Sequence, residues 1–545
     1  MTFSVAIRHL CLGEALDQAV LHWPDRIGWV FDEARVSFRE MQRRSDALAR
    51  ALLAHGIKKG DTVAIWTPNL PEFAYCQFAC AKVGAVIVAI NTRFKTFELG
   101  HVLKHSQARI LIMVERFLKH DFVSTLSDLA GDWVPEDSGR FQSANLPHLE
   151  RVISLGSVQA EGFMAFKDFE NSGEIVSQER LMQRQSEQHF DDPVILQYTS
   201  GTTALPKGAL CSHRYALNFG VEFTLRTGLK PGEPFLNTQP FYHVGGSCGA
   251  IPLPLTLGGA VVSAEYYEVE RILSLIERER CVSRSGYGAM YIMEMNHERF
   301  RDYDLSSLRG GWCVGTPALM ERVRDAFDMP DLVQIYGATE GGGAGGDYRQ
   351  SWDVRASTCG TAVTGSELAI FDPETNERLT ADEIGEIRIN GWWRMNGYLR
   401  QPLETAKAMD NEGWIHTGDL GALDAEGNLR FVGRLKDMLK IGGENVSAEE
   451  VEAVLLQNPH IKQVAVIGAP DDRLSEVVMA IVELKEGAEL DEAEVIRFCS
   501  GTVANFRVPR YVRFTREWPL TGSGKIQKHL LREIFLEEFQ SRKAG

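Results

Sequence analysis

Residues 197–208 form a segment rich in hydroxyl groups and glycine, which directly follows the short apolar run of residues 193–196. Such a run is typical of a buried strand, so the sequence predicts that the polar segment is a loop leaving a strand end. The segment offers hydroxyl and backbone N–H donors, its glycine lets the backbone approach a ligand closely, and Lys207 adds a positive charge. A polyphosphate requires these groups. Pro206 stands where a Walker A loop needs a glycine, which excludes that type of phosphate loop.

The length of the chain, 545 residues with 44% hydrophobic residues, predicts more than one domain and more than one core. Helix-like segments alternate with strand-like segments such as residues 61–66, 85–90 and 109–114. This alternation predicts a parallel sheet that is covered by helices on both faces. Residues 131–177 are polar and weakly patterned, and apart from a strand at 152–155 they are predicted to be loop.

The charge and cysteine content exclude several classes of protein. The chain has 58 Lys and Arg against 74 Asp and Glu, a net charge of −16, which argues against nucleic acid as the main partner. Its nine cysteines contain no Cys-x-x-Cys pair, which is typical of reduced, buried thiols and predicts a cytoplasmic protein. No signal peptide is predicted at the N-terminus. The low-charge stretch 73–90 is broken by Gln77, Lys82 and Gly84, so no transmembrane segment is predicted.

Residues 199–208, the phosphate loop, resemble the signature of the acyl-adenylating superfamily, which includes acyl-CoA synthetases, aryl-CoA ligases, luciferases and adenylation domains. The family pattern is Thr-Ser-Gly-Thr-Thr-Gly-x-Pro-Lys-Gly, and this chain departs from it only by Ala204 in place of the second glycine. An alanine strains the turn if that position needs a positive φ. A non-catalytic relative therefore stays open as an alternative.

Three further motifs follow in the family order. Residues 334–340 read Gln-Ile-Tyr-Gly-Ala-Thr-Glu and offer an aromatic face for adenine, a hydroxyl and a carboxylate able to bind a hard cation. Gly315-Thr-Pro stands where the family more often has Gly-Ala-Pro. Residues 414–419, Trp-Ile-His-Thr-Gly-Asp, resemble the motif whose aspartate binds both ribose hydroxyls, since a carboxylate accepts two such bonds.

The C-terminal part of the chain carries the remaining motifs. Residues 431–445 read Phe-Val-Gly-Arg-Leu-Lys-Asp-Met-Leu-Lys-Ile-Gly-Gly-Glu-Asn and resemble the family's hinge and its surface for thioester formation. Residues 520–528 read Leu-Thr-Gly-Ser-Gly-Lys-Ile-Gln-Lys and match the segment of the catalytic lysine. Six motifs in family order make the resemblance cover essentially the whole chain.

The resemblance implies a role for each residue that matches a motif. It implies catalytic roles for Lys525, Lys440, Glu340 and Lys207; ATP or AMP binding by Thr199, Ser200, Gly201, Thr202, Thr203, Gly315, Thr316, Tyr336, Gly337, Thr339, Asp419 and Arg434; a metal site at Thr202 and Glu340; an acyl pocket at His243, Val244, Gly286, Ala338 and Gly341; and a hinge and CoA face at Lys436, Gly442 and Gly443.

The resemblance also implies the fold, an α/β protein in two parts. A large N-terminal domain, residues 1–433, is expected to contain parallel and mixed sheets covered by helices. A hinge at 434–436 is expected to join it to a small, mobile α+β lid domain at 437–545. The oligomeric state stays open, a homodimer included.

The implied activity is that of an ATP-dependent acyl-CoA ligase, with Mg²⁺ as cofactor and CoA as co-substrate. A carboxylic acid and ATP would give acyl-AMP and pyrophosphate, and the CoA thiol would then give acyl-CoA and AMP. The segments that wall the acyl site in the family are apolar or small here and rich in glycine, above all at 341–346. They predict a roomy pocket for a hydrophobic medium-chain, long-chain or bulky acid.

Besides a non-catalytic relative, three alternatives remain for the function. A ligase that loads a carrier protein shares every motif up to the second half-reaction, and a luciferase-like oxygenase lies within the same family. A serine hydrolase is the rival from another class, because residues 245–249, Gly-Gly-Ser-Cys-Gly, match the nucleophile elbow of α/β-hydrolases. An elbow needs a helix straight after the serine, and Pro252 and Pro254 interrupt it here.

Overall fold

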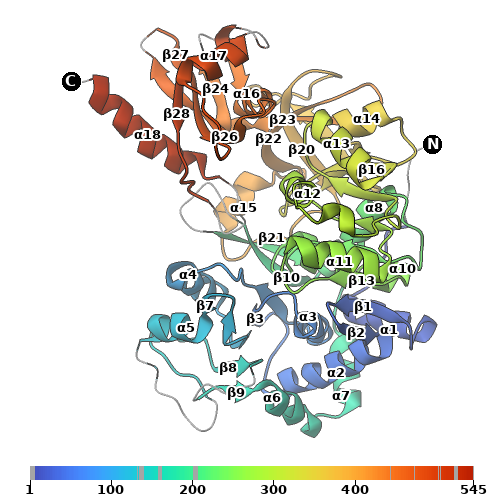
Figure 1. The fold of residues 1–545 in the computed structure, drawn as a ribbon. Helices are drawn as coiled ribbons and strands as arrows, with labels where there is room; N and C mark the ends of the chain where they lie inside the picture. The colour runs from blue at the N-terminus through green and yellow to red at the C-terminus, as the bar shows by residue number, and fades with distance from the viewer. Residues whose placement is uncertain are drawn as a thin grey trace. The chain divides into compact units, whose positions relative to one another are not determined.

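The computed structural model describes residues 6–131, 133, 140–156, 162–199, 206–441, 444–471, 473–500, 503, 505–520 and 526–543. The chain forms two compact units, residues 1–368 with 389–415 and residues 369–388 with 416–545. Each unit contains sheets covered by helices, so the predicted α/β class is confirmed (Figure 1).

The first unit contains an eight-stranded sheet in the order β21 (Gly397–Tyr398), β11 (Lys207–Ser212), β10 (Pro193–Thr199), β4 (Val86–Ala89), β3 (Thr62–Trp66), β5 (Ile110–Met113), β8 (Arg151–Ser154) and β9 (Met164–Ala165). From β10 to β9 neighbouring strands are parallel, whereas β11 and β21 add two antiparallel strands at one edge. Strands β3, β4 and β5 are buried along their whole length, as expected for a parallel sheet that is covered on both faces.

A nine-stranded sheet in the same unit has the order β18 (Thr361–Ala362), β17 (Gly343–Gly345), β16 (Asp331–Gly337), β15 (Gly310–Cys313), β14 (Ser283–Arg284), β12 (Phe235–Asn237), β13 (Val261–Ser263), β1 (Ile27–Phe31) and β2 (Ala34–Ser37). The strands from β16 to β1 are parallel, and antiparallel strands close both edges. Parallel neighbours end at the same edge of a sheet, so the residues that follow β14, β15 and β16 lie along one edge.

Helices fill three layers around these two sheets. One core, shared by residues of both sheets, contains α1 (Leu12–His22), α2 (Phe38–Ala54), α3 (Pro71–Val83) and α8 (His213–Arg226). Helices α4 (Thr96–Ser106) and α5 (Phe122–Ala130) cover the other face of the eight-stranded sheet, and α11 (Val269–Glu279), α12 (Gly288–Met295) and α13 (Pro317–Phe327) cover the other face of the nine-stranded sheet. The remaining elements of this unit are α6 (Phe166–Ser172), α7 (Gln178–Ser186), α9 (Val244–Ser247), α10 (Pro254–Leu257), α14 (Trp352–Ser357), α15 (Pro402–Ala408), η1 (Gly173–Ile175), η2 (Phe300–Asp302) and the hairpin of β6 (Arg116–Phe117) and β7 (His120–Asp121).

Helix α3 shows how local sequence sets these elements. Pro71 occupies its first position, where the missing N–H costs nothing, and Gly84 ends it with a left-handed φ of 74°. The helix is buried on all sides and is followed at once by β4, which confirms that residues 73–90 are a helix, a turn and a strand. All nine cysteines of the chain are buried.

The loop predicted for residues 131–177 is wrong at its C-terminal end. Residues 166–172 form α6, which buries Phe169 and Glu170. A helix of seven residues contains too few turns to produce a visible apolar periodicity, so the pattern gave no signal.

The second unit contains a four-stranded sheet of β19 (Ser366–Phe371), β20 (Gly385–Gly391), β22 (Ile415–Leu423) and β23 (Leu429–Arg434), and a five-stranded sheet. In the latter the order is β25 (Glu444–Ser447), β24 (Met438–Ile441), β27 (Ser475–Leu484) and β26 (Ile461–Asp471), with β28 (Tyr511–Phe514) parallel to β27. Helices α16 (Ala448–Leu455) and α17 (Glu492–Ser500) pack on one face of this sheet and α18 (Lys528–Lys543) on the other. The short helices η3 (Leu435–Asp437) and η4 (Asn505–Arg507) complete the unit.

The division into units differs from the predicted boundary at residue 433. Strand β23 belongs to the second unit, because its end packs on the start of α16: the Ser447 hydroxyl donates to the Val432 carbonyl at 2.8 Å. Strands β22 and β23 are paired, so the rest of the four-stranded sheet groups with them. The hinge at 434–436 remains a prediction. None of the helices among the described residues combines the length and the apolar character needed to span a bilayer.

Candidate active site

The two described ends of the phosphate loop lie opposite each other. Thr199 is the last residue of β10 and Lys207 the first of β11, and the antiparallel register pairs them directly. Residues 200–205 lie outside the described residues. The structure therefore confirms the strand that precedes the loop and places the first hydroxyl and the lysine of the motif side by side.

The carboxylate of Glu340 lies at the same place. Its Oε1 accepts hydrogen bonds from the Tyr398 hydroxyl at 2.8 Å and from the Thr199 hydroxyl at 3.3 Å. These contacts join the phosphate loop to the 334–340 motif across 141 residues of sequence. This direct contact supports the prediction that both motifs serve one site.

Lys207 is held on both sides. Its ammonium group pairs with the Glu404 carboxylate and lies 5.2 Å from the centre of the Tyr398 ring. The hydrogen bond from Lys207, and to a smaller extent the one from Lys407, lowers the pKa of Glu404 to about 2. Burial and the negative charge of Glu340 raise the pKa of Tyr398. At neutral pH Glu404 is therefore ionised and Tyr398 is a neutral donor.

The predicted adenine side of the site lies along the edge where β15 and β16 end. Strand β15 pairs with β16 in parallel, so Gly315, just after β15, and Tyr336, the last residue but one of β16, lie at neighbouring strand ends. The Gly315 N–H donates to Gln334 Oε1 at 3.4 Å, and Thr316 caps α13 by accepting from the Leu319 N–H at 3.3 Å. Tyr336 is buried in β16. Contact of these residues with a nucleotide remains a prediction, as it does for Gly337 and Thr339.

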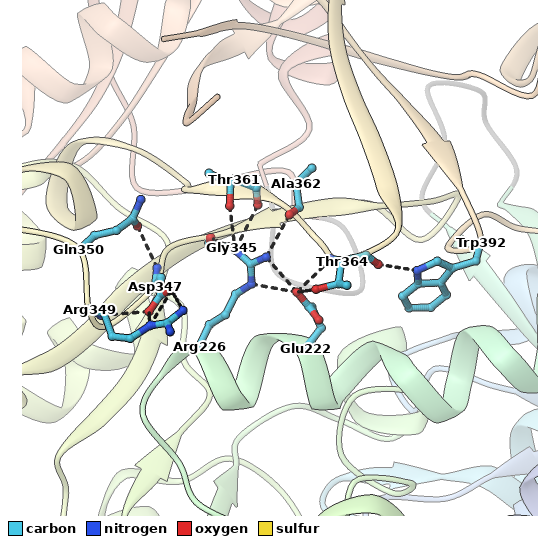
Figure 2. Close-up of polar contacts among 10 residues, drawn as sticks. All are labelled: Glu222, Arg226, Gly345, Asp347, Arg349, Gln350, Thr361, Ala362, Thr364 and Trp392. Carbon is cyan, nitrogen blue, oxygen red and sulfur yellow. Dashed lines mark hydrogen bonds and ion pairs between the residues drawn. The ribbon is translucent and has the colours of Figure 1, made fainter. Parts of the chain in front are cut away.

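Helix α8 contacts β17 and β18, the edge strands of the nine-stranded sheet, through a buried ion pair (Figure 2). Arg226 Nη2 lies 2.9 Å from Glu222 Oε1, and the two side chains are only 1% and 3% exposed. The guanidinium also donates to the carbonyl oxygens of Gly345 at 2.5 Å and Ala362 at 2.9 Å, on β17 and β18. Glu222 Oε1 accepts in turn from the Thr364 N–H at 3.1 Å. One charged pair thus holds two edge strands and the turn after them.

Aromatic side chains of the same helix hold the 334–340 motif. The Tyr215 hydroxyl donates to the Thr339 carbonyl at 3.3 Å. Phe219 and Phe223 pack edge-on to the Trp393 ring, with centroid distances of 4.7 and 5.1 Å. Residues three or four apart share one helix face, so a single face of α8 reaches the motif and the strands that follow it.

His243, predicted for the acyl pocket, directly precedes helix α9. Its Nδ1 accepts from the Gly245 N–H at 3.2 Å, so the imidazole caps the helix. Ser247, the nucleophile of the serine-hydrolase alternative, is the last residue of α9 and is fully buried. Its hydroxyl donates to the His243 carbonyl at 3.1 Å and accepts from Gln197 Nε2 at 2.5 Å. The Ser247 hydroxyl proton is therefore directed at a backbone carbonyl and not at a general base, which argues against that alternative.

The glycines of residues 341–346 do not leave free volume, and this part of the pocket prediction is wrong. A methyl carbon at Gly342, whose φ is 62°, would lie 2.0 Å from Ile389 Cγ2. One at Gly343 would lie 2.3 Å from the Tyr336 carbonyl oxygen, and one at Gly341 would lie 3.0 Å from a backbone oxygen. These glycines are required by the close approach of neighbouring strands.

We expect Gly342→Ala to destabilise the protein more than Gly60→Ala does. Both positions have a positive φ, 62° and 85°, but nothing lies within 4 Å of a methyl carbon at Gly60. The difference between the two variants should therefore report the overlap with Ile389 alone, about 1–3 kcal/mol. Urea unfolding of both variants measures it, and equal midpoints would contradict the packing described here.

The predicted ribose group lies in the second unit. Strands β22 and β23 pair Asp419 with Arg434, and Arg434 Nε lies 2.7 Å from Asp419 Oδ1. The Thr417 hydroxyl accepts from the Asp419 N–H at 3.1 Å and donates to the Ile387 carbonyl at 2.6 Å, while Gly418 adopts a φ of 66°. The motif's threonine and glycine thus shape the turn that presents the carboxylate.

The predicted hinge, CoA face and catalytic lysine lie in the second unit, and only part of these segments belongs to the described residues. Lys436 is exposed in η3, and Lys440 lies on β24 with its backbone paired to Asn445. Leu520 and Ile526 form an antiparallel bridge, so the two described ends of the catalytic-lysine segment meet. The predicted residues outside the described part of the chain are Ser200, Gly201, Thr202, Thr203, Ala204, Gly442, Gly443 and Lys525.

The residues present fit a magnesium ion that arrives with a nucleotide. Mg²⁺ is usually held by one or two carboxylates together with substrate phosphates and water. Among the described residues, no group of three or more His, Cys, Asp or Glu could hold a metal ion by itself. Glu340 with the Thr199 hydroxyl offers one carboxylate and one further oxygen, which suits a shared ion rather than a resident one.

Comparisons with known proteins agree with this geometry. The family model described as AMP-binding enzyme matches residues 16–399. The chain belongs to the AMP-binding enzyme family. The model of the AMP-binding enzyme C-terminal domain matches residues 450–525. The predicted membership of the acyl-adenylating superfamily is therefore confirmed, and so is the prediction that the protein is an enzyme.

Relatives and solved structures span almost the whole AMP-binding enzyme. "Putative acyl-CoA synthetase YngI" of Bacillus subtilis (strain 168) is 33% identical over 97% of this chain and 98% of its own. "Medium-chain acyl-CoA ligase ACSF2, mitochondrial" of Danio rerio is 32% identical over 95% of this chain and 87% of its own. The anthranilate CoA ligase AuaEII, solved with anthranoyl-AMP, has a TM-score of 0.83 at 25% identity and covers 97% of this chain and 98% of that one.

Sequence reasoning missed two residues of this AMP-binding enzyme's site. Tyr398 and Glu404 contact Glu340 and Lys207, but neither belongs to a motif recognised in the sequence. Tyr398 reaches the site because β21 pairs with β11, an edge pairing of two residues that leaves no pattern in the sequence. The dipeptide Gly397-Tyr398, shortly before Pro402, was the one available sign of a turn there.

Proposed function

We propose that this enzyme is an AMP-forming acyl-CoA ligase. The contact between Thr199 and Glu340, beside Lys207 at the paired ends of β10 and β11, carries the proposal, because it brings the phosphate-loop hydroxyl, the lysine and the cation-binding carboxylate to one place. The relatives named acyl-CoA synthetase and acyl-CoA ligase along almost the full chain support it.

In the first half-reaction a carboxylate oxygen attacks the α-phosphorus of ATP and pyrophosphate leaves. Lys207 and the hydroxyls of the phosphate loop hold the departing pyrophosphate, and Lys525 bridges the substrate carboxylate and the α-phosphate, where negative charge builds up. A bound Mg²⁺, with Glu340 and Thr202 as protein ligands, would neutralise phosphate charge. Tyr336 supports adenine, and Asp419 accepts the ribose hydroxyls.

In the second half-reaction the CoA thiol attacks the acyl carbon and AMP leaves. The C-terminal part of the chain turns about Lys436, which withdraws Lys525 and brings the surface of Lys440, Gly442 and Gly443 to the acyl-adenylate. One active site would thus serve both steps. A homodimer and a cytoplasmic location remain predictions.

The substrate is proposed to be a hydrophobic acid, of medium or long chain length or bulky. Apolar side chains remain exposed where β14 and β15 end, at the edge that the family uses for the acyl group: Tyr287 is 38% exposed and Val314 43%. Exposed apolar groups along one edge favour an apolar ligand. The relative of Danio rerio named as a medium-chain ligase points the same way.

A panel of carboxylic acids in an ATP–pyrophosphate exchange assay tests the first half-reaction. We expect exchange with octanoate or with a bulky ring acid to exceed exchange with acetate. No exchange with any acid would refute the enzyme activity proposed here, and a preference for acetate would refute the substrate class.

The acceptor is tested separately. Consumption of the acyl-adenylate by CoA, with an acyl-CoA product identified by mass spectrometry, supports the ligase. Consumption only by a phosphopantetheinylated carrier protein would favour the alternative that loads such a carrier, which the motifs fit equally well.

A further inference from the structure

Two histidines on α4 contact the described ends of the phosphate loop. His101 and His105 are one helical turn apart and therefore lie on the same face of α4. Their rings are stacked, with centroids 5.4 Å apart and planes at 11°. Neither residue belongs to a motif of the family resemblance.

Each histidine holds one end of the loop. His105 Nδ1 lies 2.9 Å from the hydroxyl of Tyr198, the residue before Thr199. His101 Nε2 lies 2.9 Å from the carbonyl oxygen of Pro206, the residue before Lys207. Thus one helix face reaches both the strand that enters the loop and the residue that leads out of it.

A tyrosine that contacts both imidazole rings strengthens this arrangement. Tyr198 stands edge-on to both imidazoles, with centroid distances of 6.1 Å to His101 and 5.9 Å to His105. Edge-to-face contacts of this kind fix the orientation of all three rings. A shift of α4 would therefore displace both Tyr198 and Pro206, the two residues bonded to the histidines.

Helix α4 is itself fixed to the site. Arg400 donates to the carbonyl oxygens of His105 at 2.7 Å and Ser106 at 3.2 Å, the last carbonyls of the helix. Arg400 follows β21 by two residues, and β21 carries Tyr398, which bonds Glu340. The histidines and the carboxylate are thus linked through a single short segment.

The protonation states agree with these bonds. Because a carbonyl oxygen only accepts, His101 Nε2 carries a proton and donates to Pro206. Burial, together with the nearby charges of His101 and Arg400, lowers the pKa of His105, and burial raises the pKa of Tyr198. A neutral His105 can accept a hydrogen bond from the Tyr198 hydroxyl at Nδ1.

We propose that His101 and His105 are positioning residues for the phosphates of ATP. The two histidines hold Tyr198 and Pro206. They thereby fix the positions of Thr199, which follows Tyr198, and of Lys207, which follows Pro206, for contact with a polyphosphate. The histidines touch no substrate, and they act on ATP affinity rather than on the affinity for the acid or for CoA. The proposal rests on the proposed function, since it takes the phosphate loop to bind ATP.

Calorimetric binding of MgATP to the full-length protein, without acid or CoA, tests the role directly. His101→Leu removes the bond to Pro206 and should weaken MgATP binding about 3- to 10-fold. His101→Gln should restore the affinity to within about twofold, because the Gln Nε2 reaches the place of the imidazole Nε2 and donates in its stead. Lys104→Leu, on the same helix but with an exposed side chain, is the matched control and should bind MgATP as the unmodified protein does.

Paired variants test the second histidine. His105→Leu and Tyr198→Phe each remove the same hydrogen bond, so the double variant should bind MgATP no more weakly than the weaker single variant. Losses that multiply would show that the two residues act independently, and this would overturn the proposal for His105.

Steady-state kinetics separate positioning from a general structural role. The KM for ATP should rise in His101→Leu while the KM values for the acid and for CoA stay within about twofold. Unchanged MgATP affinity, or a parallel rise of all three KM values, overturns the proposal. An unmodified protein that binds MgATP but supports no exchange with any acid would remove the proposed function and leave the positioning role standing. An unmodified protein that does not bind MgATP would remove both.

Discussion

Replacing Lys525 by alanine is expected to slow acyl-adenylate formation by about 10²- to 10³-fold, because in the proposed mechanism its charge stabilises the transition state only while the carboxylate attacks the α-phosphate. Formation of acyl-CoA from supplied acyl-adenylate should continue at nearly the rate of the unmodified enzyme. Rapid-quench measurement of each half-reaction distinguishes the two effects. Lys440→Ala is expected to show the reverse pattern.

Lys485 supplies a control for this experiment, because its side chain is exposed in a loop of the same unit. Lys485→Ala should leave both half-reactions unchanged. If Lys525→Ala slowed both half-reactions equally, the division of labour between Lys525 and Lys440 would be wrong.

Arg226→Met is expected to destabilise the first unit by about 3–5 kcal/mol, since it leaves the Glu222 carboxylate buried without its cation. It also removes the donors that hold Gly345 and Ala362. The urea midpoint, followed by tryptophan fluorescence, should fall accordingly. Arg39 pairs with Asp25 at the surface, with side chains 61% and 80% exposed, and Arg39→Met should produce no measurable change.

A second substitution tests the cause of this loss. In Arg226→Met combined with Glu222→Gln no buried charge remains, and the amide oxygen can still accept from the Thr364 N–H. The double variant should therefore be more stable than Arg226→Met alone. A double variant that is less stable would mean that the lost contacts to β17 and β18, and not the stranded carboxylate, account for the effect.

The sequence was sufficient for the elements whose residues carry their own local signal. The buried runs of β3, β4 and β5, the Pro71 and Gly84 boundaries of α3 and the strand before the phosphate loop all follow from patterns within a few residues. The family resemblance implied that the phosphate loop and Glu340 serve one site, and Thr199 and Glu340 are in contact.

The remaining features depend on contacts between distant parts of the chain. The number of glycines at 341–346 is plain in the sequence, but whether they face a cavity or a neighbouring backbone depends on Ile389 and the Tyr336 carbonyl. That β23 groups with the second unit likewise depends on contacts such as the bond from Ser447 to Val432. The partners of Lys207 could not be predicted, because Glu404 lies 197 residues away and belongs to no motif.

The buried cysteines give this enzyme a set of internal reporters of local opening. Eight of them lie in the first unit, and Cys499 is the one cysteine in the sequence of the second. Burial raises the pKa of the Cys499 thiol to about 11, so in the folded state it is both shielded and protonated, and a thiol reagent reacts with the thiolate. The rate at which Cys499 is alkylated therefore measures how often the second unit opens around α17. The alkylation rates of the eight other thiols report in the same way on local opening in the first unit. Mass spectrometry of one alkylated sample therefore compares the two units residue by residue without any engineered label.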